Sequence, residues 1–241
     1  MSGVGTKRTN SADAMMSVVR GRPEVACRPI TDDRPEVHMA AAEIDFWFTM
    51  GSTYSFLSVM RLAEIELSTG IKFRWRPFHL LVILQEMKNV PFADKPIKSA
   101  YMWRDIERRA AMYGIPAQLP APYPAKQSVA ANLVATIGMG EGWGANFCRA
   151  AYRRWFQLGQ ETGSEPNVSE SLRDIGQDPE RVLVLANSGQ ANAALMTETD
   201  VARELGIFGS PTFTVGRELF WGDDRLENAI DWCRSGRIHR G

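Results

Sequence analysis

Residues 44–57 read IDFWFTMGSTYSFL, and the spacing of their hydrophobic side chains changes partway along. Ile44, Phe46 and Phe48 are separated by single residues, which is the two-residue period of a strand with one buried face. From Ser52 onward the spacing lengthens to three and four residues, as on one face of a helix. The segment therefore predicts a strand, a short loop and a helix in immediate succession.

The predicted helix continues to Gly70, a residue that often ends helices. Its expected apolar face consists of Phe56, Met60, Ala63 and Leu67. A second alternating segment follows at residues 71–76 and is ended by Pro77, which predicts another strand. Two strands joined by one helix of this length form a right-handed unit with parallel strands, so the fold begins as α/β.

The rest of the chain supplies helices and then a hairpin. Residues 79–187 show helical spacing broken by prolines and glycines, enough for five or six helices and no clear strand. A further helix is expected up to Gly206, followed by strands at 212–215 and 218–221 and a last helix with Leu226, Ile230 and Cys233. This order predicts a thioredoxin-like fold made of residues 43–78 and 188–236, with residues 79–187 inserted as a helical domain. Residues 1–42, rich in proline and charge without a period, are expected to be a disordered N-terminal tail.

Composition excludes several classes of protein. Lys plus Arg and Asp plus Glu both number 28, so no basic surplus indicates nucleic acid or an anionic membrane as a partner. The three cysteines are far apart, which argues against a disulfide framework, and the three histidines have no neighbours at metal-ligand spacing. We find no apolar run long enough for a membrane span and no secretory signal, so a cytoplasmic protein is expected.

Ser52 is the first candidate for chemistry because it follows the first strand and begins the first helix, where ligands of α/β proteins gather. Thioredoxins carry a Cys-x-x-Cys motif at this place, whereas here Ser52 and Ser55 replace both cysteines. The chain therefore cannot exchange dithiol for disulfide itself, and any thiol there has to come from a ligand. A purely structural role is also open, because serine is a favoured N-cap.

Two later motifs accompany Ser52. Pro211 follows Ser210 at the start of a predicted strand, which makes this bond a candidate for the cis form, although an ordinary trans turn remains the alternative. A cis bond would expose the backbone of Ser210 for pairing with an extended peptide. Asp223 and Asp224 begin the last helix, where they could cap it or receive the charged end of a ligand.

A resemblance to a known family becomes specific when five segments are read together. They are IDFWFTMGSTYSFL (44–57), FRWRPFHL (73–80), KNVPFADKPIKSAYMWRDIERRAAMYGIP (88–116), IFGSPTF (207–213) and FWGDDRLE (220–227). In this order and spacing they resemble the glutathione-dependent 2-hydroxychromene-2-carboxylate isomerases and the related kappa-class glutathione transferases. Those proteins have the DsbA-type variant of the thioredoxin fold, which the resemblance implies here for residues 44 to 232.

The resemblance implies glutathione as cofactor and a role for each motif. Ser52 falls on the hydroxyl that hydrogen-bonds the glutathione sulfur and lowers its pKa. Ser210, before the cis Pro211, falls on the residue that pairs with the cysteinyl backbone. Thr53 departs from the family pattern, where proline is common, and leaves the exact substrate open.

The ends of the tripeptide are assigned by the same resemblance. Asn89 and Lys98 fall on positions that hold the glycyl end, and Asp223 and Asp224 on those that hold the γ-glutamyl end. A pocket cation, Lys98 or Arg76, is a candidate for the substrate carboxylate. Two further features are candidates for the substrate wall, although aromatic residues at helical spacing are more often core. They are the turn Arg76-Pro77-Phe78 and the stripe of Tyr101, Trp103 and Asp105.

The leading hypothesis is a glutathione-dependent isomerase of a 2-hydroxychromene-2-carboxylate-like aromatic or enone acid, working by reversible thiolate addition. The relatives imply a homodimer. One alternative is a kappa-type glutathione transferase or peroxidase, which consumes the thiol. The other is a non-catalytic thioredoxin-fold module that binds peptides along Ser210 and Pro211.

Overall fold

The computed structural model describes residues 43–89 and 95–239. The tail predicted for residues 1–42 lies outside them. The elements before the hairpin are β1 (Glu43–Phe48), α1 (Thr53–Thr69), β2 (Lys72–Pro77), α2 (Leu80–Glu86), α3 (Pro96–Met112), α4 (Ser128–Glu141), α5 (Gly144–Leu158), α6 (Asn167–Asp174), α7 (Pro179–Ala186) and α8 (Gly189–Glu204). They are followed by β3 (Thr212–Val215), β4 (Glu218–Trp221), a short 3-10 helix η2 (Asp223–Arg225) and α9 (Leu226–Ser235).

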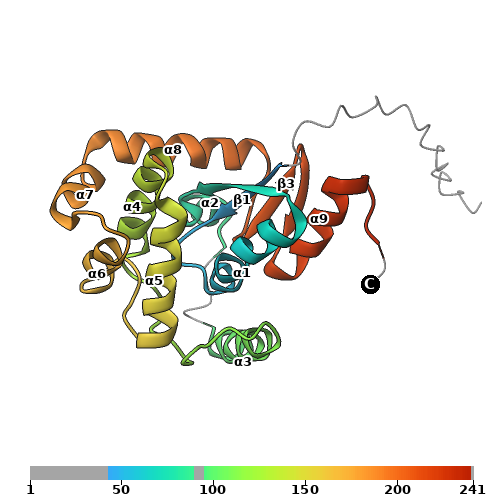
Figure 1. Ribbon diagram of the computed structural model, residues 1–241, viewed down its shortest axis with the longest axis horizontal. Coiled ribbons are helices and arrows are strands. Elements are labelled where there is room, and N and C mark those ends of the chain that lie inside the picture. Colours follow the sequence, from blue (N-terminus) through green and yellow to red (C-terminus); the bar gives the residue numbers. More distant parts are fainter. Residues whose placement is uncertain (1–42, 90–94, 240–241) are drawn as a thin grey trace, which may run out of the picture. The chain divides into compact units, whose positions relative to one another are not determined.

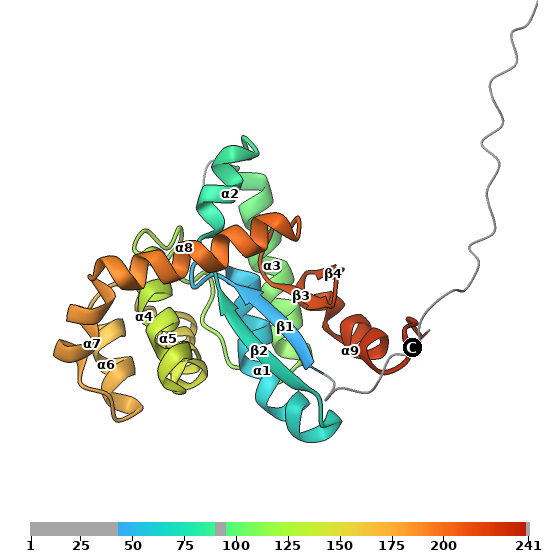
Figure 2. The same cartoon turned by 90° about the horizontal axis from the view of Figure 1, so that it is seen from above.

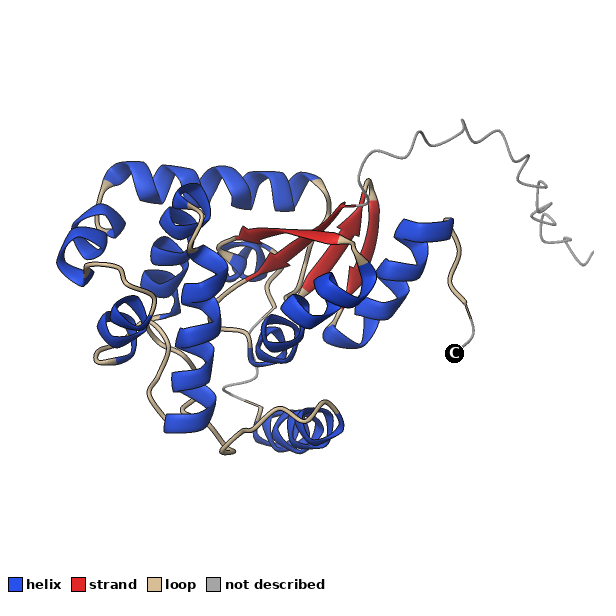
Figure 3. Cartoon of the chain, in the orientation of Figure 1, coloured by secondary structure: helices blue, strands red, loops and turns tan. Residues whose placement is uncertain are grey.

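The four strands form one sheet in the order β2-β1-β3-β4 (Figure 3). β1 and β2 are parallel, with Phe46 paired to Trp75, as the two-strand unit predicts. β3 lies antiparallel to both β1 and β4. The predicted hairpin is therefore confirmed, and its turn includes Gly216 at a φ of 61°, where glycine has no steric cost.

The prediction that β1 buries only one face is wrong. Ile44, Phe46 and Phe48 are fully buried as expected, but Trp47 on the opposite face is also 0% exposed. Trp47 packs in a second hydrophobic cluster with Phe78, Ile83, Ala202 and Ile207. The reason is that β1 is a central strand with helices on both sides: α8 covers one face of the sheet, while α1 and α9 cover the other (Figure 1).

Helix α1 ends at Gly70 as predicted, since Gly70 adopts the left-handed C-cap conformation. Its buried face differs from the prediction. Ala63 is exposed and Leu67 is 88% exposed. The residues that α1 buries completely end at Leu62, so only its first three turns are enclosed by the sheet and by α5.

Between β2 and β3 the regular elements of the described residues are all helices, as predicted. Helices α4 to α7 lie beside the sheet on the side of β2, and the two views agree on this (Figures 1 and 2). One hydrophobic cluster includes residues of the sheet, of α1 and of helices α4 to α7. Within it, Phe56 of α1 stacks on Phe156 of α5 with ring centroids 3.9 Å apart. The division into two domains at residues 79 and 187 remains a prediction.

Candidate active site

Ser52 caps the amino end of α1 with its side chain. The Ser52 Oγ accepts a hydrogen bond from the Ser55 N–H at 3.2 Å and donates one to the Ser210 carbonyl oxygen at 2.8 Å. The capping alternative is thus confirmed, and the hydroxyl also reaches the loop before β3. The first turn of α1 contains no acidic residue. The positive end of this 17-residue helix is therefore not neutralised locally and favours an anion beside Ser52.

Ser210 lies against Ser52, and the Ser210-Pro211 bond is cis, as predicted for this motif. The Ser210 hydroxyl accepts a hydrogen bond from the Thr49 N–H at 3.0 Å and pairs with the Ser55 hydroxyl at 2.8 Å. The structure thereby brings Ser52, Ser210 and Pro211 together at the carboxyl end of β1. It also shows that Ser55, in the place of the second cysteine, is 0% exposed and already hydrogen-bonded.

The described cysteines do not provide a reactive thiolate. Burial raises the pKa of Cys148 far above the usual range of a thiol, and burial also raises the pKa of the half-buried Cys233. A thiol is a weak nucleophile until it ionises, so both residues are poor candidates for catalysis. The third cysteine, Cys27, lies outside the described residues. This leaves the serine hydroxyls at the end of β1 as the chemical feature of the site.

Asp223 is 1% exposed and faces α1 rather than solvent. Its Oδ1 accepts hydrogen bonds from the Ser58 hydroxyl at 2.8 Å and from the Arg61 guanidinium at 3.3 Å. Burial raises the pKa of Asp223, and the charge of Arg61 opposes that rise. A buried carboxylate with these two donors is a structural anchor between α1 and η2, and it offers little surface to a ligand.

The prediction that Asp223 or Asp224 caps the last helix is wrong. The N-cap of α9 is Arg225, and the N-cap of η2 is Gly222, neither with a side-chain capping hydrogen bond. The reason is that the 3-10 turn comes first and directs Asp223 toward Ser58 and Arg61.

Asp224 has a more open environment, with its side chain 39% exposed. Its carboxylate lies 3.2 Å from the Arg225 guanidinium and 3.8 Å from that of Arg109. Arg109 also donates to Asp105 at 3.0 Å, and Asp105 accepts a hydrogen bond from the Tyr54 hydroxyl at 3.0 Å. A chain of four side chains therefore leads from Asp224 back to the first turn of α1.

The residues predicted for the glycyl end are accessible to a ligand. Lys98 is exposed in the first turn of α3, and Asn89 is exposed just after α2. The backbone N–H of Asn89 donates to the Leu84 carbonyl at 2.8 Å. Among the described residues, no hydrogen bond or ion pair connects either residue to Ser52, so their shared role remains a prediction.

Most of the residues predicted to line the substrate cavity contact other residues of the protein. Arg76 donates to Glu198 at 2.7 Å and lies over the Trp47 ring, and Phe78 is fully buried. Arg76 is thus already neutralised, which weakens it as the pocket cation and favours Lys98. Tyr101 is 64% exposed, whereas Trp103 is half-buried against the ring of Tyr123.

The chain is similar to proteins of a known family. The family model for the DSBA-like thioredoxin domain matches residues 43–231, which is most of the described chain. This chain belongs to the DSBA-like thioredoxin domain family. In this chain Ser52 precedes α1, and the Ser210-Pro211 bond beside it is cis.

Relatives in the DSBA-like family carry two kinds of name. The chain is 26% identical to the 2-hydroxychromene-2-carboxylate isomerase of Sphingobium xenophagum, over 76% of this chain and 94% of that protein. It is 25% identical to glutathione S-transferase kappa 1 of Caenorhabditis elegans, over 78% and 89%. A solved structure of 2-hydroxychromene-2-carboxylate isomerase superimposes with a TM-score of 0.71 and 26% identity, covering 80% of this chain and 97% of that one.

Three polar residues near Ser52 and Asp223 were not predicted from the sequence. Tyr152 of α5 and Asn132 of α4 are buried and hydrogen-bond the loop between β1 and Ser52. Arg61, the partner of Asp223, was missed as well. The available signal was a polar side chain within an otherwise apolar helical stretch, such as Asn132 between Ala131 and Leu133.

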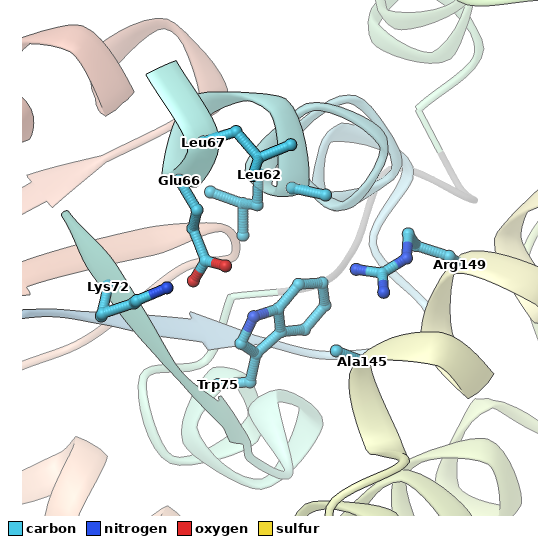
Figure 4. Close-up of a pocket in the computed structure, with 8 residues that line it drawn as sticks. Leu62, Glu66, Leu67, Lys72, Trp75, Ala145 and Arg149 are labelled. Atoms are coloured by element: carbon cyan, nitrogen blue, oxygen red, sulfur yellow. The ribbon is translucent and has the colours of Figure 1, made fainter. Parts of the chain in front are cut away.

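A cavity of about 310 Å³ lies away from these residues, between the carboxyl half of α1, β2 and the start of α5 (Figure 4). Its lining includes Leu67, Trp75 and Arg149 and none of the predicted site residues. Within residues 43–89 and 95–239, no group of three or more His, Cys, Asp or Glu side chains could hold a metal ion. None of the helices in these ranges has the length and apolar character needed to cross a bilayer.

Proposed function

We propose that this protein is a glutathione-dependent isomerase acting on a 2-hydroxychromene-2-carboxylate-like aromatic or enone acid. The observation that carries the proposal is the Ser52 hydroxyl at the unneutralised amino end of α1, 2.8 Å from the backbone of Ser210. With serine in both cysteine positions, the site has the means to stabilise a thiolate and, within the described part of the chain, no thiol of its own. The relatives named as isomerases support the choice of reaction.

The residues present fit a tripeptide with a thiol, two carboxylates and one ammonium group. Ser52 and the amino end of α1 suit the sulfur, because a hydroxyl donor and a positive helix end both favour its ionised form. The half-exposed Asp224 suits the ammonium group, whereas the buried Asp223 keeps Arg61 in place. The exposed Lys98 suits a carboxylate at the other end. We therefore divide the γ-glutamyl role between Asp224 as the contact and Asp223 as its support.

Glutathione, when bound, would supply a thiolate that adds reversibly to a conjugated double bond and permits rotation about it. The role of the protein is to hold glutathione and to favour the ionised form of its sulfur. The Ser52 hydroxyl carries one hydrogen, which now goes to the Ser210 carbonyl, and it has to turn to donate to a sulfur instead. The Ser55 N–H continues to donate to Ser52 Oγ in either position, so the oxygen stays fixed while its hydrogen changes partner.

A kappa-type glutathione transferase or peroxidase is the second candidate, favoured by two relatives from Caenorhabditis elegans at 25% and 24% identity. It would use the same residues but consume the thiol. Isomerisation of a hydroxychromene carboxylate with no loss of free thiol supports the isomerase. Conjugation of an aryl halide with thiol loss, and no isomerisation, supports the transferase.

The decisive experiment is a glutathione titration of the wild type and of Ser52→Ala, with thiolate absorbance followed near neutral pH. We expect the wild type to bind glutathione with a lowered thiol pKa, and the variant to lose that lowering. Ser188→Ala is the matched control, because Ser188 caps α8 in the same way through the Ala191 N–H at 3.2 Å. A variant at position 52 that retains the lowered pKa contradicts the role of Ser52. Cytoplasmic location and a homodimer belong to the same proposal, and sedimentation of the purified protein tests the dimer.

A further inference from the structure

Several backbone polar groups of residues 49–52 have fixed hydrogen-bond partners. The Thr49 N–H donates to the Ser210 hydroxyl at 3.0 Å, and the Ser52 N–H donates to the Thr49 carbonyl at 3.0 Å. The Met50 N–H donates to Asn132 Oδ1 at 2.7 Å. Loops usually leave such groups to solvent, so a loop held by fixed partners is set in one conformation.

Tyr152 connects the two ends of this loop. Its one hydroxyl hydrogen is shared between the Thr49 carbonyl, at 2.9 Å, and the Ser52 carbonyl, at 3.1 Å. The side chain is 0% exposed, and its ring stacks on that of Trp155 with centroids 5.8 Å apart. Burial raises the pKa of Tyr152 well above its usual value, so the phenol stays protonated and remains a donor. A single rigid side chain therefore fixes the distance between the end of β1 and the start of α1.

The hydroxyl groups of Ser210 and Ser55 make a second contact beneath the loop. Ser210 Oγ accepts from the Thr49 N–H at 3.0 Å and pairs with Ser55 Oγ at 2.8 Å, where either oxygen can be the donor. Thr49, which follows β1, is therefore held by Tyr152 of α5 and by the loop before β3.

Asn132 adds a second anchor from a neighbouring helix. It is 1% exposed, and its Nδ2 donates to the Thr49 hydroxyl at 2.9 Å while its Oδ1 accepts from Met50. Tyr152 and Asn132 come from α5 and α4, both between β2 and β3 in the chain. The helices between β2 and β3 thus supply the frame of the loop.

We infer that Tyr152 is a positioning residue for the proposed reaction: its hydroxyl, hydrogen-bonded to the carbonyls of Thr49 and Ser52, holds the Ser52 hydroxyl where a ligand sulfur meets it. The inference rests on the proposed function. Tyr152 itself is buried beneath the loop and does not contact a ligand.

The test compares the wild type, Tyr152→Phe and the control Ser171→Ala in the full-length protein. Tyr152→Phe keeps the stacked ring and removes only the donor. Ser171 is also 0% exposed, but its hydroxyl donates to Asn167 Oδ1 at 3.2 Å within α6, away from the loop. The first readout is hydrogen exchange at the Met50 and Ser52 amides without ligand. The second is the pH profile of glutathione bound to each protein, together with kcat and KM for isomerisation.

We expect amide exchange in the loop to rise about tenfold in Tyr152→Phe and to be unchanged in Ser171→Ala, since one hydrogen bond corresponds to roughly this factor. The bound thiol should ionise at higher pH, and kcat should fall about tenfold with KM within about twofold. Normal loop exchange and a normal thiol profile in Tyr152→Phe overturn the inference, even if the variant melts earlier. A wild type that does not lower the thiol pKa overturns the proposed function instead, and the exchange data then decide the positioning role alone.

Discussion

The Ser52 hydroxyl donates a hydrogen bond to the Ser210 carbonyl oxygen at 2.8 Å, although 158 positions separate the two residues in the chain. This contact joins the amino end of α1 to the loop before β3, the two segments that the fold brings to one end of the sheet. It places a polarised hydroxyl next to a backbone that can pair with an extended ligand.

The same contact predicts how Ser52→Ala affects stability. The variant loses an N-cap, worth about 1 kcal/mol, and in addition the hydrogen bond to Ser210, worth about 1 kcal/mol more. We expect urea unfolding to show a loss of about 2 kcal/mol. Ser188→Ala removes a cap alone and should cost about half as much. Equal losses in the two variants would mean that the bond to Ser210 adds nothing.

Asp223→Asn should change the pH dependence of stability in a defined direction. Burial raises the pKa of Asp223 above its ordinary value of 3.8, so the folded protein holds this proton more tightly than the unfolded chain. The contribution of Asp223 to the free energy of unfolding is greatest below pH 3.8, and it is lost as the pH rises through the pKa that Asp223 has in the folded protein. The free energy of unfolding of the wild type, relative to Asp223→Asn, should therefore fall as pH increases. Urea unfolding at a series of pH values measures this, and a difference that grows with pH contradicts it.

Asp105→Asn should show the opposite slope. Partial burial would raise the pKa of Asp105, but hydrogen bonds from Arg109 and Tyr54 prevail and hold it below the ordinary 3.8. Its stabilising contribution is therefore complete above that value and is lost as pH falls through the lower folded pKa. The wild type should exceed Asp105→Asn in stability near neutral pH, and the gap should narrow below about pH 4. An unchanging gap down to acid unfolding would refute the role given to Arg109 and Tyr54.

Asp224→Ala should weaken glutathione binding without unfolding the protein. The side chain is 39% exposed, so its removal is expected to change stability by no more than about 0.5 kcal/mol. Calorimetry with glutathione and with cysteinylglycine, which lacks the γ-glutamyl group, isolates the contact between Asp224 and that group. The wild type should prefer glutathione, and Asp224→Ala should bind both ligands about equally. If Asp224→Ala keeps the full preference for glutathione over cysteinylglycine, the γ-glutamyl group binds at another place.

Gly163→Ala should be strongly destabilising. Gly163 has a φ of 81°, and an added Cβ would lie 1.9 Å from the Gln127 carbonyl oxygen, just before α4. Gly159 is the matched control, since its φ is 68° and nothing lies within 4 Å of an added Cβ. Gly159→Ala should cost about 1 kcal/mol from backbone strain alone. Gly163→Ala should cost roughly 1 to 3 kcal/mol more from the overlap, measured by thermal or urea unfolding.

The positions of Ser52 and Ser210 could be predicted because each follows from the order of the elements. A residue at the end of the first strand and one before a strand-opening proline meet in any fold of this topology. The burial of Trp47 could not be predicted from its own segment. A two-residue period shows which residues share a face, but whether a helix covers the second face depends on α8, which lies far along the chain.

The partners of the charged residues could not be predicted either. Asp223 and Arg61 are 162 positions apart, and nothing local distinguishes a buried Asp223 from an exposed Asp224 beside it. The cap that was expected at this point rested on local preference, which the preceding 3-10 turn overrides. Tyr152 looked like one more core aromatic residue, and only its contact with two carbonyls reveals a second role.

The side chains from Asp224 through Arg109 and Asp105 to Tyr54 connect the region proposed for the γ-glutamyl end of a ligand with the first turn of α1, beside the residue proposed to hold its sulfur. A cation that binds Asp224 competes with Arg109, whose guanidinium then interacts more fully with Asp105. That carboxylate in turn accepts the hydrogen bond of Tyr54, two residues beyond Ser52. A change of charge at Asp224 therefore reaches, through two ion pairs, a hydrogen bond made in the first turn of α1.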